Sequence, residues 1–354
     1  MARISGDSRW SGPIRGRSVV VLSGGLDSAI IAEAGRSVLG LSAAVTVLCT
    51  DEDATDRPYA TASAAAAGLE HFMVEVTVRE LLERELPTCV RALRTFDPMT
   101  LRNEVAVCAA LREAAARGFT CAVMGDAADE LLGGYSFTHG LDDKAWAKSR
   151  DGMAALMDFG SPHLGAQFGM WVAQPYRDQR FVRAARTFGK AECIVSADEA
   201  AAAAVTASGC STTGAALPFD ANDARPLPKT MGKMPLRKAF PVVSSAWRRK
   251  DPIEVGCGTT ALSRPGWWDS QISDEEWERE REAIKTRQGV ALRDKEHLAY
   301  YRAFREVFPN GAIPGVARHD SDPCPACGYQ MRNARGCFCH TCGHYDETLR
   351  GPRK

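Results

Sequence analysis

The segment from Ser18 to Leu39 constrains the fold of this chain more than any other segment. An apolar, β-branched run at 18–22 is followed by a Gly-Gly turn and then by a helical pattern from Ser28 onward. This order predicts a strand, a tight loop and a helix. Glycines in such a loop let the backbone approach an anion closely, and the N–H groups at the start of the helix then face its oxygens. The segment therefore predicts an α/β fold with a phosphate-binding loop.

The loop carries more information than a plain glycine turn between a strand and a helix would. Its residues, which we expect to bind ATP, are Ser23, Gly24, Gly25, Leu26, Asp27 and Ser28. The two serine hydroxyls add donors for phosphate oxygens. Asp27 would repel a phosphate unless a divalent cation lay between them, which indicates Mg²⁺. The loop is not of the Walker A type, because the Gly-Lys-Ser/Thr ending of that motif is absent.

Strand and helix patterns alternate up to residue 124. Further strands are predicted at 43–49, 72–78 and 121–124, with helices at 57–67, 79–94 and 100–117. Such alternation predicts a doubly wound, mostly parallel sheet with helices on both faces. Beyond about residue 140 the pattern is helical and less regular, with a helix predicted at 198–207, a loop at 208–236 and a helical stretch at 273–308.

Composition and the ends of the chain exclude some classes of protein. Lys+Arg equals Asp+Glu at 44 each in 354 residues, so the bulk charge indicates neither a nucleic-acid-binding protein nor a membrane-surface protein. There is no apolar run of about 18 residues, so we expect no membrane span. Residues 1–17 are polar, lack the apolar core of a signal peptide and predict a flexible leader. These features predict a cytoplasmic protein with reduced cysteines.

A second motif follows the strand predicted at 121–124. It runs Gly-Asp-Ala-Ala-Asp-Glu-Leu-Leu-Gly-Gly-Tyr from Gly125 to Tyr135. Acidic side chains at the carboxyl edge of a parallel sheet lie where such folds bind ligands. We therefore expect Asp129 and Asp27 to share one Mg²⁺. An acidic, glycine-rich surface turn is the alternative interpretation of the same string.

The two motifs together resemble those of the synthetase domain of asparagine synthetases and of β-lactam synthetase, within the PP-loop ATP pyrophosphatase superfamily. The resemblance continues in order at 100–102, 169–184, 233–240 and 247–250. It implies an adenine nucleotide α-hydrolase-like domain over residues 18–308, with a helical part from about residue 140. It also implies cleavage of ATP between the α- and β-phosphates, which yields AMP and pyrophosphate.

A basic segment at 225–250 contains eight Lys or Arg residues and no Asp or Glu. Such a segment favours an anionic ligand, although a solvated basic face has the same composition. The resemblance to the family implies that Lys250 holds the α-phosphate and stabilises developing charge, and that Arg237 and Asp126 are further catalytic residues. It also implies that Gly125 contributes to ATP binding and that Asp126 contacts the acceptor or an intermediate.

The sequence departs from the family at two places. The family's glutaminase domain begins with a cysteine directly after the initiator Met, whereas Ala2 stands here and only 22 residues precede the loop. We therefore expect ammonia to come free or from a partner protein, or not to be used. The family's Glu and Arg in the string Gly-x-Glu-Ala-Arg are Trp171 and Ala173 here. The loss of these two charges makes aspartate a doubtful substrate.

Five of the twelve cysteines lie between Cys324 and Cys342. The four expected to bind a structural Zn²⁺ form two Cys-x-x-Cys pairs, each followed by Gly: Cys324, Cys327, Cys339 and Cys342. Cys337 is a substitute ligand. This pattern predicts a zinc ribbon at 324–345 after a linker at 309–323. Its basic neighbours, Arg332, Arg335, Arg350, Arg353 and Lys354, fit docking to RNA, docking to a protein, or solubility alone.

Two functional interpretations remain open from the sequence. In the first, the enzyme adenylates a carboxylate of a small-molecule or carrier-bound acceptor and transfers it to ammonia or an amine. In the second, a PP-loop enzyme adenylates a nucleobase or tRNA carbonyl for nitrogen or sulfur insertion, with a separate donor protein and a ribbon that aids docking. The second motif and the Lys250 segment favour the first. The missing glutaminase and the cysteine pairs favour the second.

Overall fold

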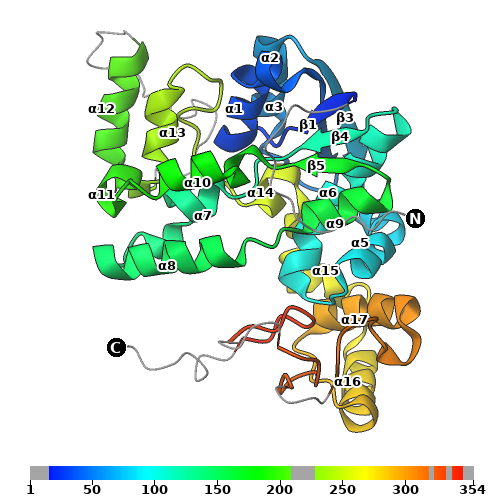
Figure 1. Cartoon of the computed structure of the whole chain (residues 1–354). Helices are drawn as coiled ribbons and strands as arrows, with labels where there is room; N and C mark the ends of the chain where they lie inside the picture. The colour runs from blue at the N-terminus through cyan, green and yellow to red at the C-terminus, as the bar shows by residue number, and fades with distance from the viewer. Residues whose placement is uncertain (1–15, 209–227, 319–322, 332–336, 346–354) are drawn as a thin grey trace. The chain divides into compact units, whose positions relative to one another are not determined.

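The computed structural model describes residues 16–208, 228–318, 323–331 and 337–345 (Figure 1). The chain divides into two compact units. Unit 1 comprises Met1–Val47, Thr55–Val74 and Ala110–Pro252, and unit 2 comprises Leu48–Ala54, Glu75–Ala109 and Ile253–Lys354. The leader predicted at 1–17 lies almost entirely outside the described residues, and the boundaries predicted at 308 and 324 remain predictions.

Most of the secondary structure belongs to unit 1. Its strands are β1 (Ser18–Val21), β2 (Leu41–Cys49), β3 (Glu70–Val76), β4 (Cys121–Val123), β5 (Trp171–Ala173), β6 (Val195–Ser196) and β7 (Thr230–Met231), where β2 and β3 end in unit 2. Its helices are α1 (Leu26–Glu33), α2 (Arg36–Leu39), α3 (Arg57–Ala67), α7 (Ala128–Leu132), α8 (Asp143–Leu156), α9 (Gly160–Gln167), α10 (Gln179–Ala185), α11 (Lys190–Cys193), α12 (Ala197–Ser208) and α13 (Met234–Ala239), with 3₁₀ turns η1 (Ser136–Thr138) and η2 (Pro175–Arg177).

Among its described residues, unit 2 is mostly helical outside the cysteine segment and the ends of β2 and β3. It contains α4 (Val78–Arg84), α5 (Leu86–Leu93), most of α6 (Pro98–Ala116), α14 (Ile253–Cys257), α15 (Pro265–Asp269), α16 (Asp274–Gln288) and α17 (Lys295–Val307), with 3₁₀ turns η3 (Thr259–Ser263) and η4 (Pro309–Gly311). Among the residues that the structure describes, no helix is long and apolar enough to cross a membrane.

The sheet has the strand order β3-β2-β1-β4-β5. Strand β1 pairs in parallel with both β2 and β4, so that Val20 stands beside Ala44 on one side and Val123 on the other. Strand β4 pairs in parallel with β5. The chain therefore leaves β1 toward one edge and returns to its other side at β4, which places the switch in strand order between β1 and β4. The predicted doubly wound, mostly parallel α/β fold is confirmed.

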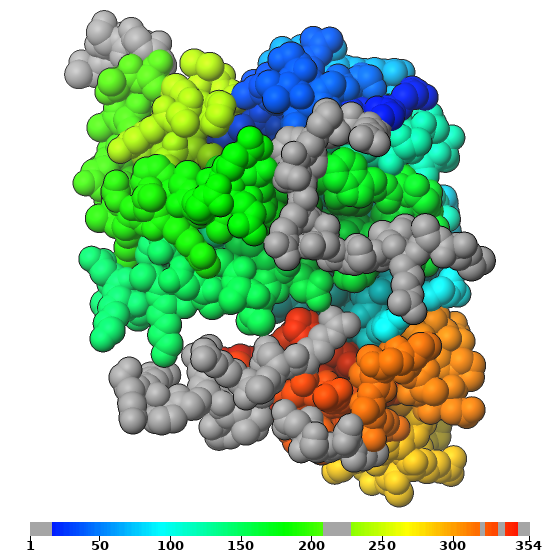
Figure 2. Space-filling model, viewed as in Figure 1, coloured from blue at the N-terminus to red at the C-terminus, as the bar shows by residue number. Residues whose placement is uncertain are grey.

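The core of unit 1 forms around this sheet. Val20, Ala44 and Val123 are fully buried, as expected for strands covered by helices on both faces. Helix α7 contacts α8 and α10, and α11 contacts α8 and α13. In Figure 2 the green helices of this set present a continuous surface of side chains.

Three predictions about local structure are wrong. Helix 28–39 is divided into α1 and α2 at Gly35, where a Cβ would lie 2.5 Å from the Ile31 carbonyl oxygen. Helix 79–94 is likewise divided into α4 and α5, next to Pro87. The predicted loop at 208–236 contains β7 and the start of α13, while 209–227 lie outside the described residues. Strand β5 was not predicted, because three residues give too short a pattern.

In unit 2 the cysteine segment packs on an aromatic core. The ring of Phe304 in α17 lies 4.9 Å from that of Phe96 and 6.0 Å from that of Tyr329, measured between centroids. The Tyr329 hydroxyl donates to the Gly311 carbonyl at 2.6 Å, and the Phe96 N–H donates to the Thr341 carbonyl at 2.8 Å. Within unit 2, the cysteine segment is therefore held by both aromatic packing and backbone hydrogen bonds.

Candidate functional site

The loop after β1 requires glycine at its centre. Gly24 has φ +68°, and a Cβ there would lie 2.8 Å from the Asp56 carbonyl oxygen and 2.9 Å from the Ala60 nitrogen. The buried Ser245 hydroxyl donates to the Gly24 carbonyl at 2.6 Å. Backbone and side chains therefore close in on Gly24 from both sides, and only glycine fits there.

The serines of the loop bond to one another across its base. The Ser23 N–H donates to Ser28 Oγ at 3.2 Å, and Ser28 Oγ donates to the Gly25 carbonyl at 3.1 Å. Gly25 is the residue before α1 and has no side-chain cap, so the N–H groups at the start of this helix remain available to a ligand. Leu26 is buried, so its side chain belongs to the core and only its backbone belongs to the loop.

The second motif begins directly after β4 and lies against the loop. A Cβ on Gly125 would lie 3.1 Å from Asp27 Cβ, so the two segments are in close contact there. Ala127 has φ +86°, a left-handed conformation unusual for a residue other than glycine. A Cβ on Gly134 would lie 1.7 Å from Asp129 Oδ1, so a glycine is needed beside this carboxylate.

Asp27 and Asp129, the two predicted Mg²⁺ ligands, are brought together around one ammonium group. Lys233 Nζ lies 2.5 Å from Asp27 Oδ2 and 2.7 Å from Asp129 Oδ1. Lys250 Nζ lies 3.2 Å from Asp129 Oδ2. The Lys233 side chain is 4% exposed, whereas that of Lys250 is 41% exposed. The site is therefore a compact cluster of two acids and two lysines at the carboxyl edge of the sheet.

The two carboxylates differ in their electrostatics. Burial raises the pKa of Asp27 above its ordinary value, although the Lys233 charge opposes this. Burial acts on Asp129 too, but Lys233 and Lys250 outweigh it and lower the pKa of that carboxyl well below its usual range. Asp27 Oδ1 is buried and has no hydrogen-bond donor among the described residues. A buried carboxylate oxygen without a partner, beside a second carboxylate, fits a divalent cation.

Asp126 lies in a hydrogen-bonded network of its own. Its Oδ2 accepts from Ser161 Oγ at 2.6 Å and from Gln174 Nε2 at 2.7 Å. Gln174 Oε1 in turn accepts from Arg177 at 2.7 Å, which fixes the orientation of the amide. Burial raises the pKa of Asp126, and the two donated hydrogen bonds oppose that rise. Helix α9 and strand β5 thus hold the carboxylate in one orientation.

Arg237 contacts backbone carbonyls. Its Nε donates to the Gly232 carbonyl at 2.9 Å, and its Nη1 donates to the carbonyls of Ala246 and Arg248. The side chain is 3% exposed, and burial lowers the pKa of the guanidinium to about 10. These contacts fix the segment that leads to Lys250. Arg237 therefore has the geometry of a residue that positions this segment.

Four residues of this region were not singled out by sequence reasoning. Lys233 begins the segment 233–240 that resembles the family, but the sequence assigned it no role, and nothing in the sequence shows its φ of +60°. Ser161, Gln174 and Ser245 are common polar residues whose burial, 3% exposed or less, becomes visible only in three dimensions. Gly232 directly before Lys233 was the one local signal that the backbone there approaches another segment closely.

The four predicted zinc ligands form a second candidate site, in unit 2. The sulfur atoms of Cys324, Cys327, Cys339 and Cys342 all lie within 4.8 Å of one another and are buried. Two of the Sγ–Sγ distances are 3.7 Å. A tetrahedron with Zn–S bonds of about 2.3 Å has edges of about 3.8 Å, so this cluster fits Zn²⁺. Cys337 is not part of it.

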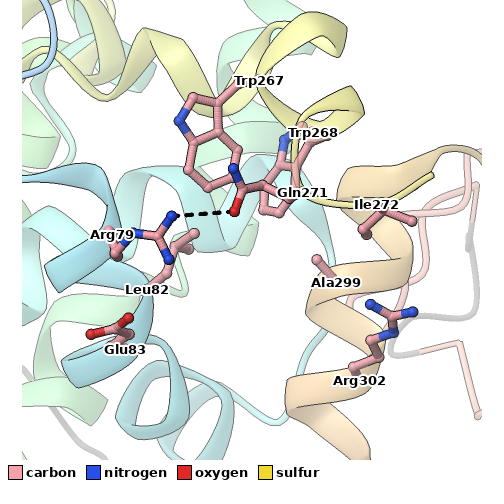
Figure 3. A pocket seen from close by; sticks show the side chains of 9 residues that line it. All are labelled: Arg79, Leu82, Glu83, Trp267, Trp268, Gln271, Ile272, Ala299 and Arg302. Carbon is pink, nitrogen blue, oxygen red and sulfur yellow. Dashed lines mark hydrogen bonds between the residues drawn. The ribbon is translucent and has the colours of Figure 1, made fainter.

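Unit 2 also contains a pocket of about 220 Å³ between α4, α15 and α17 (Figure 3). Its lining combines apolar side chains with charged ones at the rim: Arg79, Leu82, Glu83, Trp267, Trp268, Gln271, Ile272, Ala299 and Arg302. A long hydrogen bond of 3.5 Å joins Arg79 to Gln271 in Figure 3. No residue of the phosphate loop or of the second motif lines this pocket.

A doubly wound sheet with a glycine-rich phosphate loop after β1 and an acidic motif after β4 defines a nucleotide-binding α/β protein. The model of the asparagine synthase family matches residues 16–206, more than half of the chain. This protein therefore belongs to the asparagine synthase family, and this membership implies an ATP-dependent, ligase-type enzyme.

The proteins similar to this chain include one sequence relative and one solved structure. A probable glutamine-hydrolysing asparagine synthetase of Dictyostelium discoideum is 25% identical over 324 residues, which cover 82% of this chain and 51% of that protein. The chain thus spans about half the length of this relative. A solved structure described as a predicted subunit of tRNA methyltransferase from Methanocaldococcus jannaschii has a TM-score of 0.27 and 13% identity, covering 51% of this chain and 78% of the other. This last likeness is too weak to assign a function.

Proposed function

We propose that this protein adenylates a carboxylate with ATP, releases pyrophosphate and transfers the acyl group to ammonia or an amine. The observation that carries the proposal is the cluster of Asp27, Asp129, Lys233 and Lys250 beside an open helix start. Two carboxylates suited to a metal ion and two lysines suited to phosphate oxygens meet at one edge of the sheet. Family membership supplies the ATP-dependent ligation chemistry.

Asp27 and Asp129 would hold Mg²⁺, which when bound neutralises phosphate charge and orients the polyphosphate. The backbone of the loop and the hydroxyls of Ser23 and Ser28 bind the phosphates that leave as pyrophosphate. Lys250 is the lysine with room to reach a ligand, because its side chain is 41% exposed. We assign it the charge that develops at the α-phosphate.

The remaining residues orient these groups. Arg237 fixes the carbonyls of the segment before Lys250. Asp126, held by Ser161 and Gln174, faces the acceptor or the intermediate. A buried carboxyl with a raised pKa is suited to accepting a proton from an incoming amine.

The cysteine cluster has a structural role in this proposal. Four cysteine ligands complete a tetrahedral coordination sphere and leave no position open for substrate. Zn²⁺ there would stabilise the fold of the segment that packs on Phe304. We further propose that this segment docks RNA or a protein that donates ammonia, sulfur or an amine. We also propose that the protein is located in the cytoplasm.

The alternative, adenylation of a nucleobase or tRNA carbonyl, is favoured by the cysteine cluster and by the absence of charge at Trp171 and Ala173. Exchange of labelled pyrophosphate into ATP separates the two. Exchange that depends on a small or carrier-bound carboxylate supports the amide-forming ligase. Exchange that depends on RNA supports the alternative, and formation of ADP and phosphate with either acceptor contradicts both.

A further inference from the structure

Lys233 occupies the space between the two carboxylates that we propose as Mg²⁺ ligands. We propose that Lys233 is a stand-in cation: it holds Asp27 and Asp129 together in the nucleotide-free protein, excludes free Mg²⁺, and gives up its place when the metal arrives with ATP. This inference rests on the proposed function. Beyond the proposed function, it states that the metal ion and the nucleotide bind as a coupled pair.

The position of Lys233 is set by its backbone. Its N–H donates to the Leu132 carbonyl at 3.0 Å, and a Cβ on the preceding Gly232 would lie 1.9 Å from the Gly133 carbonyl oxygen. The turn before α13 is therefore in direct contact with the second motif. The φ of +60° at Lys233 is a conformation that costs free energy in any residue but glycine.

The second motif leaves space for the lysine stem. A Cβ on Gly134 would lie 2.5 Å from Lys233 Cε and 1.7 Å from Asp129 Oδ1. Glycine at this position is therefore what allows the ammonium group to reach both acids. The glycines of both segments and the left-handed backbone all serve the same contact.

The charges explain why the ammonium group and a metal ion exclude each other. Without a cation between them, Asp27 would lose its ion-pair partner and Asp129 would keep only Lys250, so two buried carboxylates would face each other, which is strongly unfavourable. Lys233 supplies that cation, and its Nζ lies within 2.7 Å of an oxygen of each acid. A Mg²⁺ ion bound to the same oxygens would place two cations in contact.

ATP changes this balance, because its phosphates bring negative charge that can receive the displaced ammonium group. Mg²⁺ then gains the two carboxylates while Lys233 gains phosphate oxygens. The affinity of the site for the metal should therefore rise when nucleotide binds, and by linkage the affinity for nucleotide rises with the metal.

The test uses Mn²⁺ as the metal probe and the electron paramagnetic resonance signal of free Mn²⁺ as the readout, so that no turnover is needed. Binding is measured with the full-length protein alone and with α,β-methylene-ATP, which cannot be cleaved at the reacting bond. The analogue itself chelates Mn²⁺, so its binding without protein is measured and subtracted. Wild type with the analogue should then bind Mn²⁺ at least about tenfold more tightly than wild type alone or the analogue alone, the size of a typical coupling between sites. Lys233→Met should bind Mn²⁺ without nucleotide at least about tenfold more tightly than wild type does.

Two further variants make the comparison specific. Lys238→Met removes the same charge from an exposed position of α13, the helix that follows Lys233, and should leave nucleotide-free binding unchanged. Lys233→Arg keeps a cation between the acids and should continue to exclude free Mn²⁺.

The outcomes separate this inference from the function on which it rests. Equal Mn²⁺ affinity of wild type with and without the analogue would overturn the stand-in role, whether or not Lys233→Met folds. Unchanged nucleotide-free binding in a folded Lys233→Met would overturn it as well. If wild type binds no Mn²⁺ even with the analogue, the Asp27–Asp129 metal site itself is wrong and the proposed function loses its main support.

Discussion

Replacing Lys250 with alanine should separate catalysis from stability in this protein. Its ammonium group lies 3.2 Å from Asp129 Oδ2, but the side chain is 41% exposed. An ion pair this exposed contributes only about 0–1 kcal/mol to folding. Asp129 also keeps the buried Lys233 as a partner at 2.7 Å. Lys250→Ala should therefore lower the free energy of unfolding by less than about 1 kcal/mol.

The same substitution should strongly affect the reaction. Loss of one preorganised positive group at a developing charge costs about 10²–10³-fold in kcat, or about 2.7–4 kcal/mol. Binding of Mg-ATP should change only a few-fold, because the contact strengthens in the transition state. Lys250→Arg should recover little, since a planar guanidinium does not replace a compact ammonium group.

The assay is single-turnover release of pyrophosphate together with equilibrium binding of ATP. Arg249→Ala is the matched control, because Arg249 Nε lies 3.9 Å from Asp251 and the side chain is 32% exposed. If Arg249→Ala is inactive while Lys250→Ala is active, the catalytic lysine has been assigned to the wrong position. If both variants are active, the segment is a solvated basic face and the proposed role of Lys250 is wrong.

Three other predictions concern stability and the two candidate sites. Cys324→Ser should remove the zinc found by elemental analysis of the wild type and lower the melting temperature, since metal binding here is folding free energy; an unchanged melting temperature would contradict a structural metal. Gly134→Ala should lose Mg²⁺-dependent activity and about 1–3 kcal/mol of stability, because the added Cβ would lie 1.7 Å from Asp129 Oδ1. Gly140→Ala is the control and should have no effect, because nothing lies within 4 Å of a Cβ at that position. Burial raises the pKa of Glu296 to about 7. Protonation of Glu296 therefore contributes fully to the stability of the folded state below about pH 4.5, and this contribution is lost as the pH rises through 7. The melting temperature of wild type should fall over this range more than that of Glu296→Gln does.

The sequence predicted the elements that carry strong patterns. Strand β1, buried except at Val21, and the fully buried β4 form apolar runs because helices cover both faces of the sheet, and glycine strings follow them where the backbone must turn. These two loops supplied the predicted ATP-binding loop residues and both predicted Mg²⁺ ligands, whereas Lys250 and Arg237 came from the later basic segment. Cys-x-x-Cys pairs supplied the second site for the same reason, since ligand spacing is a local property of the chain.

What the sequence did not show depends on contacts between distant segments. Lys233 lies 206 positions after Asp27, and only the folded chain brings its turn against the second motif. Strand β5 is three residues long and includes Trp171, which is 42% exposed, so that its pattern indicates no strand. Gln174 became a partner of Asp126 only because β5 pairs with β4. Periodicity cannot report pairings of this kind.

We propose that Asp126 faces the acceptor, and its surroundings favour a substrate without a second charged group near the reacting carbon. Asp126 already receives hydrogen bonds from Ser161 and Gln174, so its carboxylate is compensated by neutral donors. At the family's arginine position, Ala173 is 1% exposed within β5 and offers no charge to a ligand. Arg177 is the cation of this network, but it already donates to Gln174 Oε1 at 2.7 Å and lies beside Asp126, so a second carboxylate, as on aspartate, would find no cation at position 173 itself. We therefore expect carboxylates with an uncharged body to support pyrophosphate exchange better than aspartate does.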